Sequence, residues 1–404
     1  MSVSSLVGGS TPELARREQT VGVLGGGQLG RMLVHVAQRM GFRVVVLDPD
    51  ADCPAGRAAD RLLRAAYDDP AALAELAAAC AWVTTEFENV PAASLQQLAA
   101  TSQVSPRADA VRLCQHRALE KAHFVASGVA CAPHARLESP ADLDRITDDL
   151  LPGILKTSQL GYDGKGQVRV SQRADLTAAW AQLRHAPCVL EALVPIRTEL
   201  SVLVARAADG AMVTLPVQQN QHRDGILAIT QVPPHHVELS TCEQVDAMAR
   251  QLASSMGYVG VLCVEFFVLA DGRVLANEMA PRPHNSGHPS LDACDLSQFE
   301  LQLRTLVGWP LVQPRLHSPT VMINLMGDLW FARGPGVDAV EPDWPAVLAL
   351  PGVHLHLYGK AEPRPARKMG HLTVTAPSAD AARDVAARAL ALLGLPPIAD
   401  PVSA

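Results

Sequence analysis

The sequence has few charged and few aromatic residues, and it contains no long apolar run. Among its 404 residues, 19% are charged and 4% aromatic, and the formal net charge is -7. General nucleic-acid binders usually present a basic face, so this balance argues against that class. It leaves room for a small anionic ligand, which needs only a few local cations. No apolar run reaches the roughly 18 residues of a membrane span, so we expect no contact with a membrane.

Paired cysteines are also lacking. The eight cysteines include no C-x-x-C pair, which argues against a zinc site or a redox-active dithiol. Scattered free cysteines are typical of the reducing cytoplasm, where we expect this chain. Residues 1–19 are polar and lack the apolar core of a signal peptide, so we interpret them as a disordered tail.

The length and the patterns predict three folded domains after this tail. Strands alternate with helices over residues 20–112, which predicts a parallel α/β sheet. Strands within residues 113–310 pair with near neighbours, which predicts antiparallel sheet and an α+β domain. Residues 311–404 contain strands at 353–358 and 371–375 and then a helix, which predicts a small C-terminal domain rich in β-structure.

A glycine-rich turn lies between the first predicted strand and helix. Gly25, Gly27 and Gly30 match G-x-G-x-x-G, and Asp48 ends the next strand, near the spacing of a ribose-binding acid. The pattern fits NAD or FAD. It also fits other phosphorylated ligands, because a helix N-terminus offers N–H groups to any anion. A purely structural turn is the third alternative.

A second glycine-rich segment, residues 161–166, follows a strand that ends near Lys156. Three glycines in six residues expose N–H groups that could cover a polyphosphate, and a lysine on a strand could hold its charge. The segment is not a Walker A motif. The alternative is a hairpin turn beside a solvated lysine.

Two carboxylates are predicted to face each other on neighbouring strands. If Asp271-Gly272 is a two-residue hairpin turn, counting outward places Glu265 opposite Glu278. Like charges opposite each other destabilise a hairpin unless a cation compensates, and Mg²⁺ prefers such oxygen ligands. The alternatives are an exposed pair or a different register.

Two polar clusters follow this hairpin. Residues 282–288 are dense in donors, and Pro283, Gly287 and Pro289 argue against a helical H-x-x-x-H metal pair, which leaves local capping as the alternative. The second cluster comprises Lys360, Arg364, Arg367 and Lys368. It could clamp a phosphate monoester or simply form a solvated face.

Six strings in one order resemble the N5-carboxyaminoimidazole ribonucleotide synthetase family of ATP-grasp ligases. The resemblance runs from about residue 20 to residue 375. The strings are GGGQLGRM at 25–32, TTEFENVP at 84–91, GYDGKGQ at 161–167, NQHRDGI at 220–226, NEMAPRPHNSGH at 277–288 and GKAEPRPARKMGH at 359–371. The resemblance implies an ATP-grasp fold with a Rossmann-like N-terminal domain (20–112), a central ATP-grasp domain (113–310) and a C-terminal domain (311–404).

The resemblance also implies the site. It places ATP at Arg117, Lys156, Glu191, Ala192, Leu193, Val194, Glu199, His222, Asn277 and Glu278, under a loop of Gly161, Tyr162, Asp163, Gly164, Lys165, Gly166 and Gln167. It places bicarbonate and the ribonucleotide at Tyr162, Asp163, Arg282, His284, Asn285, Lys360 and Arg367, with the turn Gly27, Gln28 and Leu29. Glu265 and Glu278 would hold magnesium, for which manganese could substitute.

The family chemistry implied is carboxylation of aminoimidazole ribonucleotide. ATP would phosphorylate bicarbonate, a poor electrophile, to carboxyphosphate, and the substrate amine would then attack it or the carbon dioxide that it releases. The resemblance also implies a homodimer. The alternatives are a formate-dependent ATP-grasp transformylase, an NAD-dependent oxidoreductase built on Gly25–Gly30, and a non-catalytic nucleotide sensor.

Overall fold

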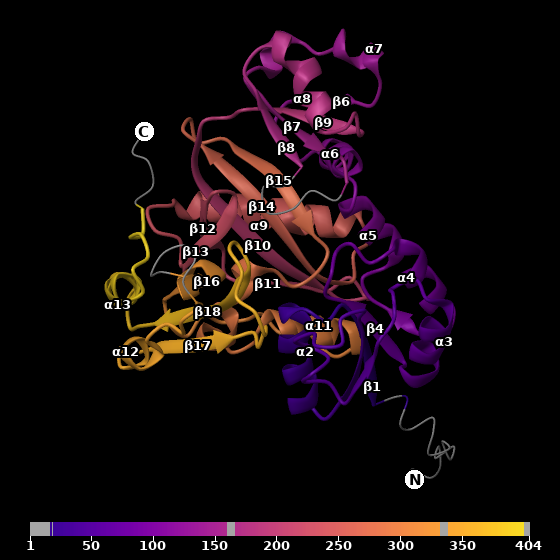
Figure 1. The fold of residues 1–404 in the computed structure, drawn as a ribbon, viewed down its shortest axis with the longest axis vertical. Helices are drawn as coiled ribbons and strands as arrows, with labels where there is room; N and C mark the ends of the chain where they lie inside the picture. Colours follow the sequence, from indigo (N-terminus) through magenta and orange to yellow (C-terminus); the bar gives the residue numbers. More distant parts are fainter. Residues whose placement is uncertain (1–16, 18, 160–165, 332–337, 400–404) are drawn as a thin grey trace, which may run out of the picture. The chain divides into compact units, whose positions relative to one another are not determined.

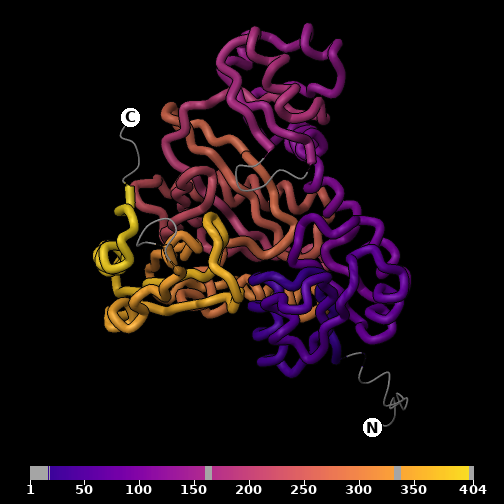
Figure 2. Tube along the Cα trace, viewed as in Figure 1, coloured from indigo at the N-terminus to yellow at the C-terminus, as the bar shows by residue number. Residues whose placement is uncertain are grey.

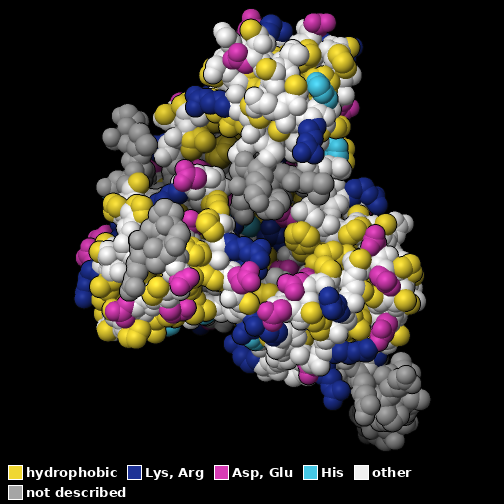
Figure 3. All heavy atoms as spheres, viewed as in Figure 1, with side chains coloured by type: hydrophobic (Ala, Val, Ile, Leu, Met, Phe, Trp, Pro, Cys, Tyr) yellow, Lys and Arg dark blue, Asp and Glu magenta, His cyan; other side chains and the backbone are white. Residues whose placement is uncertain are grey.

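The computed structural model describes residues 17, 19–159, 166–331 and 338–399. The chain divides into two compact units, residues 1–108 and 109–404 (Figure 1). None of the helices in these ranges is both long and apolar enough for a membrane span. On the face drawn in Figure 3, acidic, basic and apolar side chains are interspersed over the described residues.

The first unit is built on a five-stranded parallel sheet with the order β3-β2-β1-β4-β5. Its central strand is buried along its whole length, as expected for a parallel strand covered on both faces. The strands are β1 (Thr20–Leu24), β2 (Arg43–Leu47), β3 (Arg61–Leu63), β4 (Trp82–Thr85) and β5 (Gln103–Val104). The helices are α2 (Gln28–Arg39), α3 (Pro70–Ala79), α4 (Ala92–Leu98) and α5 (Ala108–Cys114), of which α5 leads into the second unit.

The second unit contains a small antiparallel sheet with the order β6-β9-β7-β8. Its apolar face packs on α8, where Trp180 is buried with Leu155 and Leu190. The elements of this region are α6 (Arg117–Ala126), β6 (His134–Leu137), α7 (Pro140–Leu143), β7 (Gly153–Thr157), β8 (Gln167–Val170), α8 (Leu176–Gln182) and β9 (Cys188–Ala192).

The larger sheet of the second unit has nine strands, with the order β15-β14-β10-β12-β13-β16-β18-β17 and β11 beside β10. β13 pairs with β16, so the last three strands continue the same sheet. The strands are β10 (Ile196–Arg206), β11 (Met212–Thr214), β12 (Gln218–Arg223), β13 (Ile226–Val232), β14 (Gly260–Leu269), β15 (Val274–Ala280), β16 (Thr320–Met326), β17 (Val353–Leu357) and β18 (Lys368–Thr375).

Helices cover this sheet in two regions. α9 packs on β10 and β14 through Val245, Ala249 and Leu252, and α13 packs on β16 and β18 through Ala386 and Leu390. The helices of this part are α9 (Leu239–Ser255), α10 (Ser290–Ala293), α11 (Gln298–Val307), α12 (Trp344–Leu348) and α13 (Ala379–Leu392).

The segment after α13 returns to β12, the strand that carries His222 (Figure 2). Arg223 donates to the carbonyls of Pro396 and Pro397, at 3.0 and 2.8 Å. Gln221 exchanges hydrogen bonds with the backbone of Ala399. Residues near the C-terminus therefore hold one end of β12.

Candidate active site

Three cations converge on Glu191, which lies in β9. The Lys156 and Lys121 ammonium groups lie 3.1 and 3.3 Å from Glu191 Oε2, and Arg117 Nη1 lies 3.9 Å from Oε1. Arg117 also reaches Glu278, at 3.6 Å. The side chain of Lys121 is fully buried, and those of Arg117 and Lys156 are 15% and 14% exposed. Three positive charges thus face two carboxylates, which leaves a partly buried excess of positive charge.

The pKa values follow from this crowding. Burial opposes the charge of Glu191, but Lys121, Lys156 and Arg117 together lower its pKa to about 2. Burial lowers the pKa of Lys156 despite the nearby Glu191 carboxylate. Burial raises the pKa of Glu120 to about 8, and this carboxyl accepts a hydrogen bond from Met279 N at 2.6 Å. A buried anionic ligand would therefore be attracted by the positive charge that the two carboxylates do not balance.

Glu199 and His222 form a second pair, on the neighbouring strands β10 and β12. The distance between Glu199 Oε2 and His222 Nδ1 is 2.6 Å. Burial alone would lower the pKa of His222, but the contact with Glu199 outweighs it and raises the pKa to about 9. The imidazole is therefore charged at neutral pH.

The hairpin of β14 and β15 brings its two carboxylates together by a route that the sequence did not predict. Leu269 N donates to Arg273 O at 2.8 Å, so the turn has three residues, and the prediction of a two-residue turn was wrong. Gly272, with φ of +86°, supplies the left-handed residue of such a turn. Farther along, Phe266 pairs with Ala276, whereas Val264 pairs with Met279. β15 thus contains a bulge of one extra residue.

The turn adds one residue to the register, and the extra residue of the bulge in β15 compensates for it. Glu265 lies opposite the bulge residues Asn277 and Glu278, so the predicted pairing of the two carboxylates is kept. Burial, and then the charge of Glu278, raise the pKa of Glu265 to about 8. Two facing carboxylates, of which Glu265 is 13% and Glu278 47% exposed, favour a bound cation.

In the segment 282–288, the ring of His284 has partners, whereas the side-chain amide of Asn285 has none among the described residues. His284 Nδ1 lies 2.9 Å from Ser286 Oγ, and its Nε2 lies 3.8 Å from Glu265 Oε1. Burial and then the Arg282 charge hold the pKa of His284 well below its usual range, so the ring is neutral. Asn285 is 7% exposed, and neither atom of its amide finds a partner among the described residues. Arg282 Nη1 donates to Pro283 O at 3.0 Å.

The members of the late cationic cluster differ in exposure and in their partners. Arg364 is exposed and pairs with Glu362 at 2.8 Å, as expected of a solvated face. Lys360 is half-buried, donates to Lys368 O at 2.6 Å and lies 5.6 Å from the centre of the Tyr358 ring. Arg367 is half-buried and donates to Glu362 O at 2.8 Å.

The glycine-rich turn of the first unit is occupied by the protein's own acids. Gly27 N and Gly30 N donate to the buried Glu86 carboxylate, at 2.8 and 3.1 Å. Asp48 accepts from Gly26 N and from Tyr67 Oη, both at 2.6 Å. Because its Oδ2 already accepts these two bonds, Asp48 does not present a free carboxylate to a ribose.

The remaining predicted residues lie at the ends of strands or outside the residues that the structure describes. Residues Gly161, Tyr162, Asp163, Gly164 and Lys165 lie outside the described residues. Gly166 accepts from Thr157 N at 2.9 Å, and Gln167 pairs with Lys156. Ala192 ends β9, Leu193 N donates to Pro152 O at 2.9 Å, and Val194 packs near Leu269. In the turn of the first unit, Gly27 and Gln28 are half-buried and Leu29 is buried.

Two residues that were not predicted from the sequence, Glu120 and Lys121, and one that was predicted only as a member of the cationic cluster, Lys368, belong to this region. Glu120 and Lys121 follow Arg117 at helical spacings of three and four, a signal that they share its face of α6. The positive charge of Lys368 contributes to lowering the pKa of His284. No local pattern distinguishes Lys368 from its neighbours in the cationic cluster.

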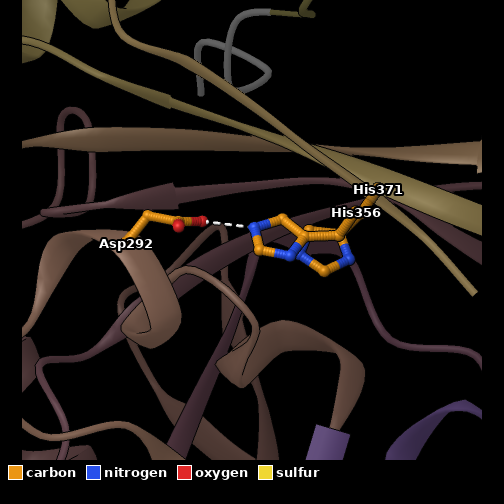
Figure 4. Close-up of side chains that lie close together, drawn as sticks. All are labelled: Asp292, His356 and His371. Carbon is orange, nitrogen blue, oxygen red and sulfur yellow. Dashed lines mark hydrogen bonds and ion pairs between the residues drawn. The ribbon is translucent and has the colours of Figure 1, made fainter. Parts of the chain in front are cut away.

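Asp292, His356 and His371 form a further polar cluster (Figure 4). His356 Nε2 lies 2.8 Å from Asp292 Oδ2. The rings of His356 and His371 stack with centres 4.4 Å apart and planes 10° apart. Ligand lone pairs of imidazole lie in the ring plane, so two nearly parallel stacked rings do not point at one ion. This arrangement is a stack and not a preformed metal centre.

Comparison with known proteins agrees with this geometry. Residues 18–115 match the ribonucleotide synthetase preATP-grasp domain, and residues 122–299 match the ATP-grasp domain. Residues 320–385 match the phosphoribosylaminoimidazole carboxylase C-terminal domain. The N5-carboxyaminoimidazole ribonucleotide synthase of Brucella melitensis is 44% identical over 88% of this chain and 95% of its own length. This chain belongs to the N5-carboxyaminoimidazole ribonucleotide synthase family. It is an ATP-dependent ligase.

Solved structures of the family have the same fold. The Staphylococcus aureus N5-carboxyaminoimidazole synthetase complexed with ADP has a TM-score of 0.84 and 35% identity, over 93% of this chain and 97% of that one. The Aspergillus clavatus synthase in complex with ADP and 5-aminoimidazole ribonucleotide has a TM-score of 0.84 and 30% identity, over 94% and 99%. The expected fold class and ligase activity are thereby confirmed. The individual site residues remain predictions.

Proposed function

We propose that the chain uses ATP to carboxylate 5-aminoimidazole ribonucleotide with bicarbonate. The products would be N5-carboxyaminoimidazole ribonucleotide, ADP and phosphate, a step of purine biosynthesis. The observation that carries the proposal is the excess of buried positive charge at Arg117, Lys121 and Lys156, in a chain of this family. A nucleotide polyphosphate is the anion that this family would supply.

ATP would replace part of the ion pairing around Glu191. Lys156 and Arg117 would contact its phosphates, and the segment after β9 would contact the adenine. Glu199, held by His222 at 2.6 Å, is a suitable acceptor for ribose hydroxyl groups. Because the cations are already positioned on β7 and α6, they would need little rearrangement as charge moves during phosphoryl transfer.

Glu265 and Glu278 would hold Mg²⁺, for which Mn²⁺ could substitute. Hard carboxylate oxygens are the ligands that these ions prefer, and Glu265 faces a second acid across the bulge. Burial and then the charge of Glu278 raise the pKa of Glu265, and a cation bound between the two carboxylates would offset their repulsion. When bound, the ion would neutralise charge on the ATP phosphates.

Bicarbonate would be activated by phosphoryl transfer. A bicarbonate oxygen attacks the γ-phosphorus, the bond to ADP breaks, and carboxyphosphate forms. The exocyclic amine of aminoimidazole ribonucleotide then attacks the carbon, phosphate leaves, and the amine loses a proton. Asp163 is the residue proposed to steer that proton, beside Tyr162.

The ribonucleotide would be held by residues of the segment 282–288 and of the late cationic cluster. Asn285 offers a buried amide without a partner among the described residues, and neutral His284 presents Nε2 on the side of Glu265. Arg282, Lys360 and Arg367 would supply the positive charge for the phosphate monoester. In the first unit, Glu86 already takes two N–H groups of the glycine-rich turn, so Gln28 is the side chain left there for the substrate.

One assay tests the reaction and separates it from the formate-dependent alternative. ADP release would be measured with aminoimidazole ribonucleotide, first without and then with added bicarbonate, and then with formate. We expect turnover to require the ribonucleotide and bicarbonate. Turnover that depends on formate and ignores bicarbonate would contradict the proposal.

We also propose a homodimer, on the strength of the family resemblance. One chain has a mass of 42.9 kDa, so sedimentation equilibrium would give about twice that value. A single-chain mass at micromolar concentration would contradict it.

A further inference from the structure

Gln298, the first residue of α11, is a fully buried amide that holds the segment 284–288 at both ends. Its Oε1 accepts from His284 N at 2.7 Å, and its Nε2 donates to His284 O at 2.8 Å. Its Nε2 also lies 3.1 Å from His288 Nδ1. An amide nitrogen can only donate, so His288 Nδ1 accepts and its proton lies on Nε2. Both N–H groups of the amide are therefore used on this one segment.

These bonds are not needed to begin the helix. Ser297 caps α11 by accepting from Glu300 N at 3.2 Å, and Gln298 N itself donates to Ser290 Oγ at 3.0 Å. The hydrogen bonds of the Gln298 side chain thus go to His284 and His288 and not to the start of the helix. The approach is close: a Cβ placed on Gly287 would lie 2.5 Å from Gln298 Oε1.

The segment has a second anchor on the ring of His284. Ser286 N donates to His284 Nδ1 at 3.3 Å, and Ser201 Oγ donates to Ser286 Oγ at 2.8 Å. A ring that accepts at Nδ1 carries its proton on Nε2, which is the nitrogen toward Glu265. His284 is therefore held at its N–H, its carbonyl and its ring, whereas the buried amide of Asn285 has no hydrogen-bond partner in the part of the chain that the structure describes.

We infer that Gln298 is a positioning residue that fixes His284 and Asn285 for binding of the ribonucleotide. This inference rests on the proposed function. Gln298 is fully buried and binds the backbone of His284, so it acts through that segment. Removing its amide leaves the N–H of His284 without its acceptor and leaves the carbonyl of His284 with Gly287 N alone, which costs enough to rearrange the segment. Its hydrogen bonds include none to the three cations around Glu191, so we expect ATP binding to change little when it is replaced.

The test compares Gln298→Met with Gln302→Met. Gln302 lies one turn along α11, is equally buried, and accepts from Val261 N at 2.6 Å through the same kind of amide. Both variants lose buried hydrogen bonds and stability. Only Gln298→Met should raise the KM for aminoimidazole ribonucleotide, by about 10-fold, because only this variant releases the segment that carries His284 and Asn285. The KM for ATP should stay within about twofold of the wild type in both variants.

A spectroscopic measurement reports the contact directly. In protein labelled with ¹⁵N at histidine, the Nδ1 resonance of His288 should shift in Gln298→Met and stay in place in Gln302→Met. If Gln298→Met fails to fold, Gln298→Glu keeps the volume and the acceptor for His284 N but removes both donors, and the same KM criterion applies.

The outcomes separate the two claims. Wild-type protein without ribonucleotide-dependent turnover would overturn the proposed function, and the positioning role with it. An active wild type with a normal ribonucleotide KM in Gln298→Met would overturn the positioning role alone. An equal rise in both variants would also overturn it, because the effect would then be general destabilisation.

Discussion

Glu265 lies opposite Glu278 across β14 and β15. The turn that joins these strands has three residues, one more than a direct pairing of the two glutamates would require. The bulge at Asn277 and Glu278 restores the register beyond the turn. Bulges are found next to active sites, where they redirect side chains. Here the bulge places a second acid, Glu278, within 3.6 Å of Arg117.

The carboxylate pair leads to the first prediction. Glu278→Gln removes a charge at nearly constant shape, so ATP turnover should fall at least about 100-fold, a barrier increase of roughly 2.7 kcal/mol. ADP release would be measured on variant protein with an unchanged circular dichroism spectrum. Asp271→Asn, at the exposed turn of the same hairpin, is the matched control and should remain active. Near-normal turnover in Glu278→Gln would rule out the metal role.

The second prediction concerns the cationic cluster. Lys360→Ala or Arg367→Ala should weaken use of aminoimidazole ribonucleotide by more than about tenfold, since a charge-assisted hydrogen bond contributes roughly 1.5–3 kcal/mol. The dissociation constant for ATP should change little, as measured by titration. Arg364→Ala, which removes an exposed partner of Glu362 from the same segment, should leave both ligands unaffected. Loss of ATP binding with substrate binding retained would reverse the assignment of the two subsites.

The third prediction is that the glycine-rich turn binds no dinucleotide. Glu86 and Asp48 already occupy the N–H groups of Gly26, Gly27 and Gly30. Aminoimidazole ribonucleotide should raise the thermal midpoint, whereas millimolar NAD, NADP or FAD should not. A saturable shift with a dinucleotide, lost in Gly27→Val, would revive an oxidoreductase.

The fourth prediction is a pH dependence of stability from buried His288. Burial, and then the charge of His356, lower the pKa of His288 from 6.5 to about 3. The unfolded chain therefore binds this proton below pH 6.5 while the folded chain does not, so the contribution of His288 to stability falls as pH falls. Between pH 7.5 and 5.5 this contribution should decrease by about 1.4 kcal/mol.

Urea unfolding of the wild type and of His288→Gln at both pH values tests this sign. The variant lacks the titrating group, so from pH 7.5 to 5.5 its unfolding free energy should change by about 1.4 kcal/mol in the stabilising direction relative to that of the wild type. Equal pH dependence in both proteins would show that His288 is not buried as a neutral ring. Glu120 and Glu265, whose pKa values are raised to about 8, act in the opposite direction in both proteins, so only the difference between the two proteins reports His288. A difference of the opposite sign would contradict the lowered pKa.

Local sequence was enough to predict much of the architecture. The buried apolar strand before Gly25 and the amphipathic helix after it predicted the parallel first sheet, because these periodicities are properties of neighbouring residues. The hairpin around Gly272 and the two glutamates within it were visible for the same reason. Their facing arrangement was predicted correctly, but the predicted turn had one residue fewer than the observed turn, and the bulge was not predicted.

Only the tertiary structure decided how the charges are paired. Lys121 meets Glu191 from seventy positions away and binds the carbonyl of Asn277, which is more distant still. Asp48 has the spacing of a ribose-binding acid, but the fold directs it to Gly26 and Tyr67. Burial of a charge depends on which distant segments surround it, and that information is absent from local periodicity. The sequence by itself therefore determined the elements and the residue types, whereas their partners and pKa values were decided by long-range packing.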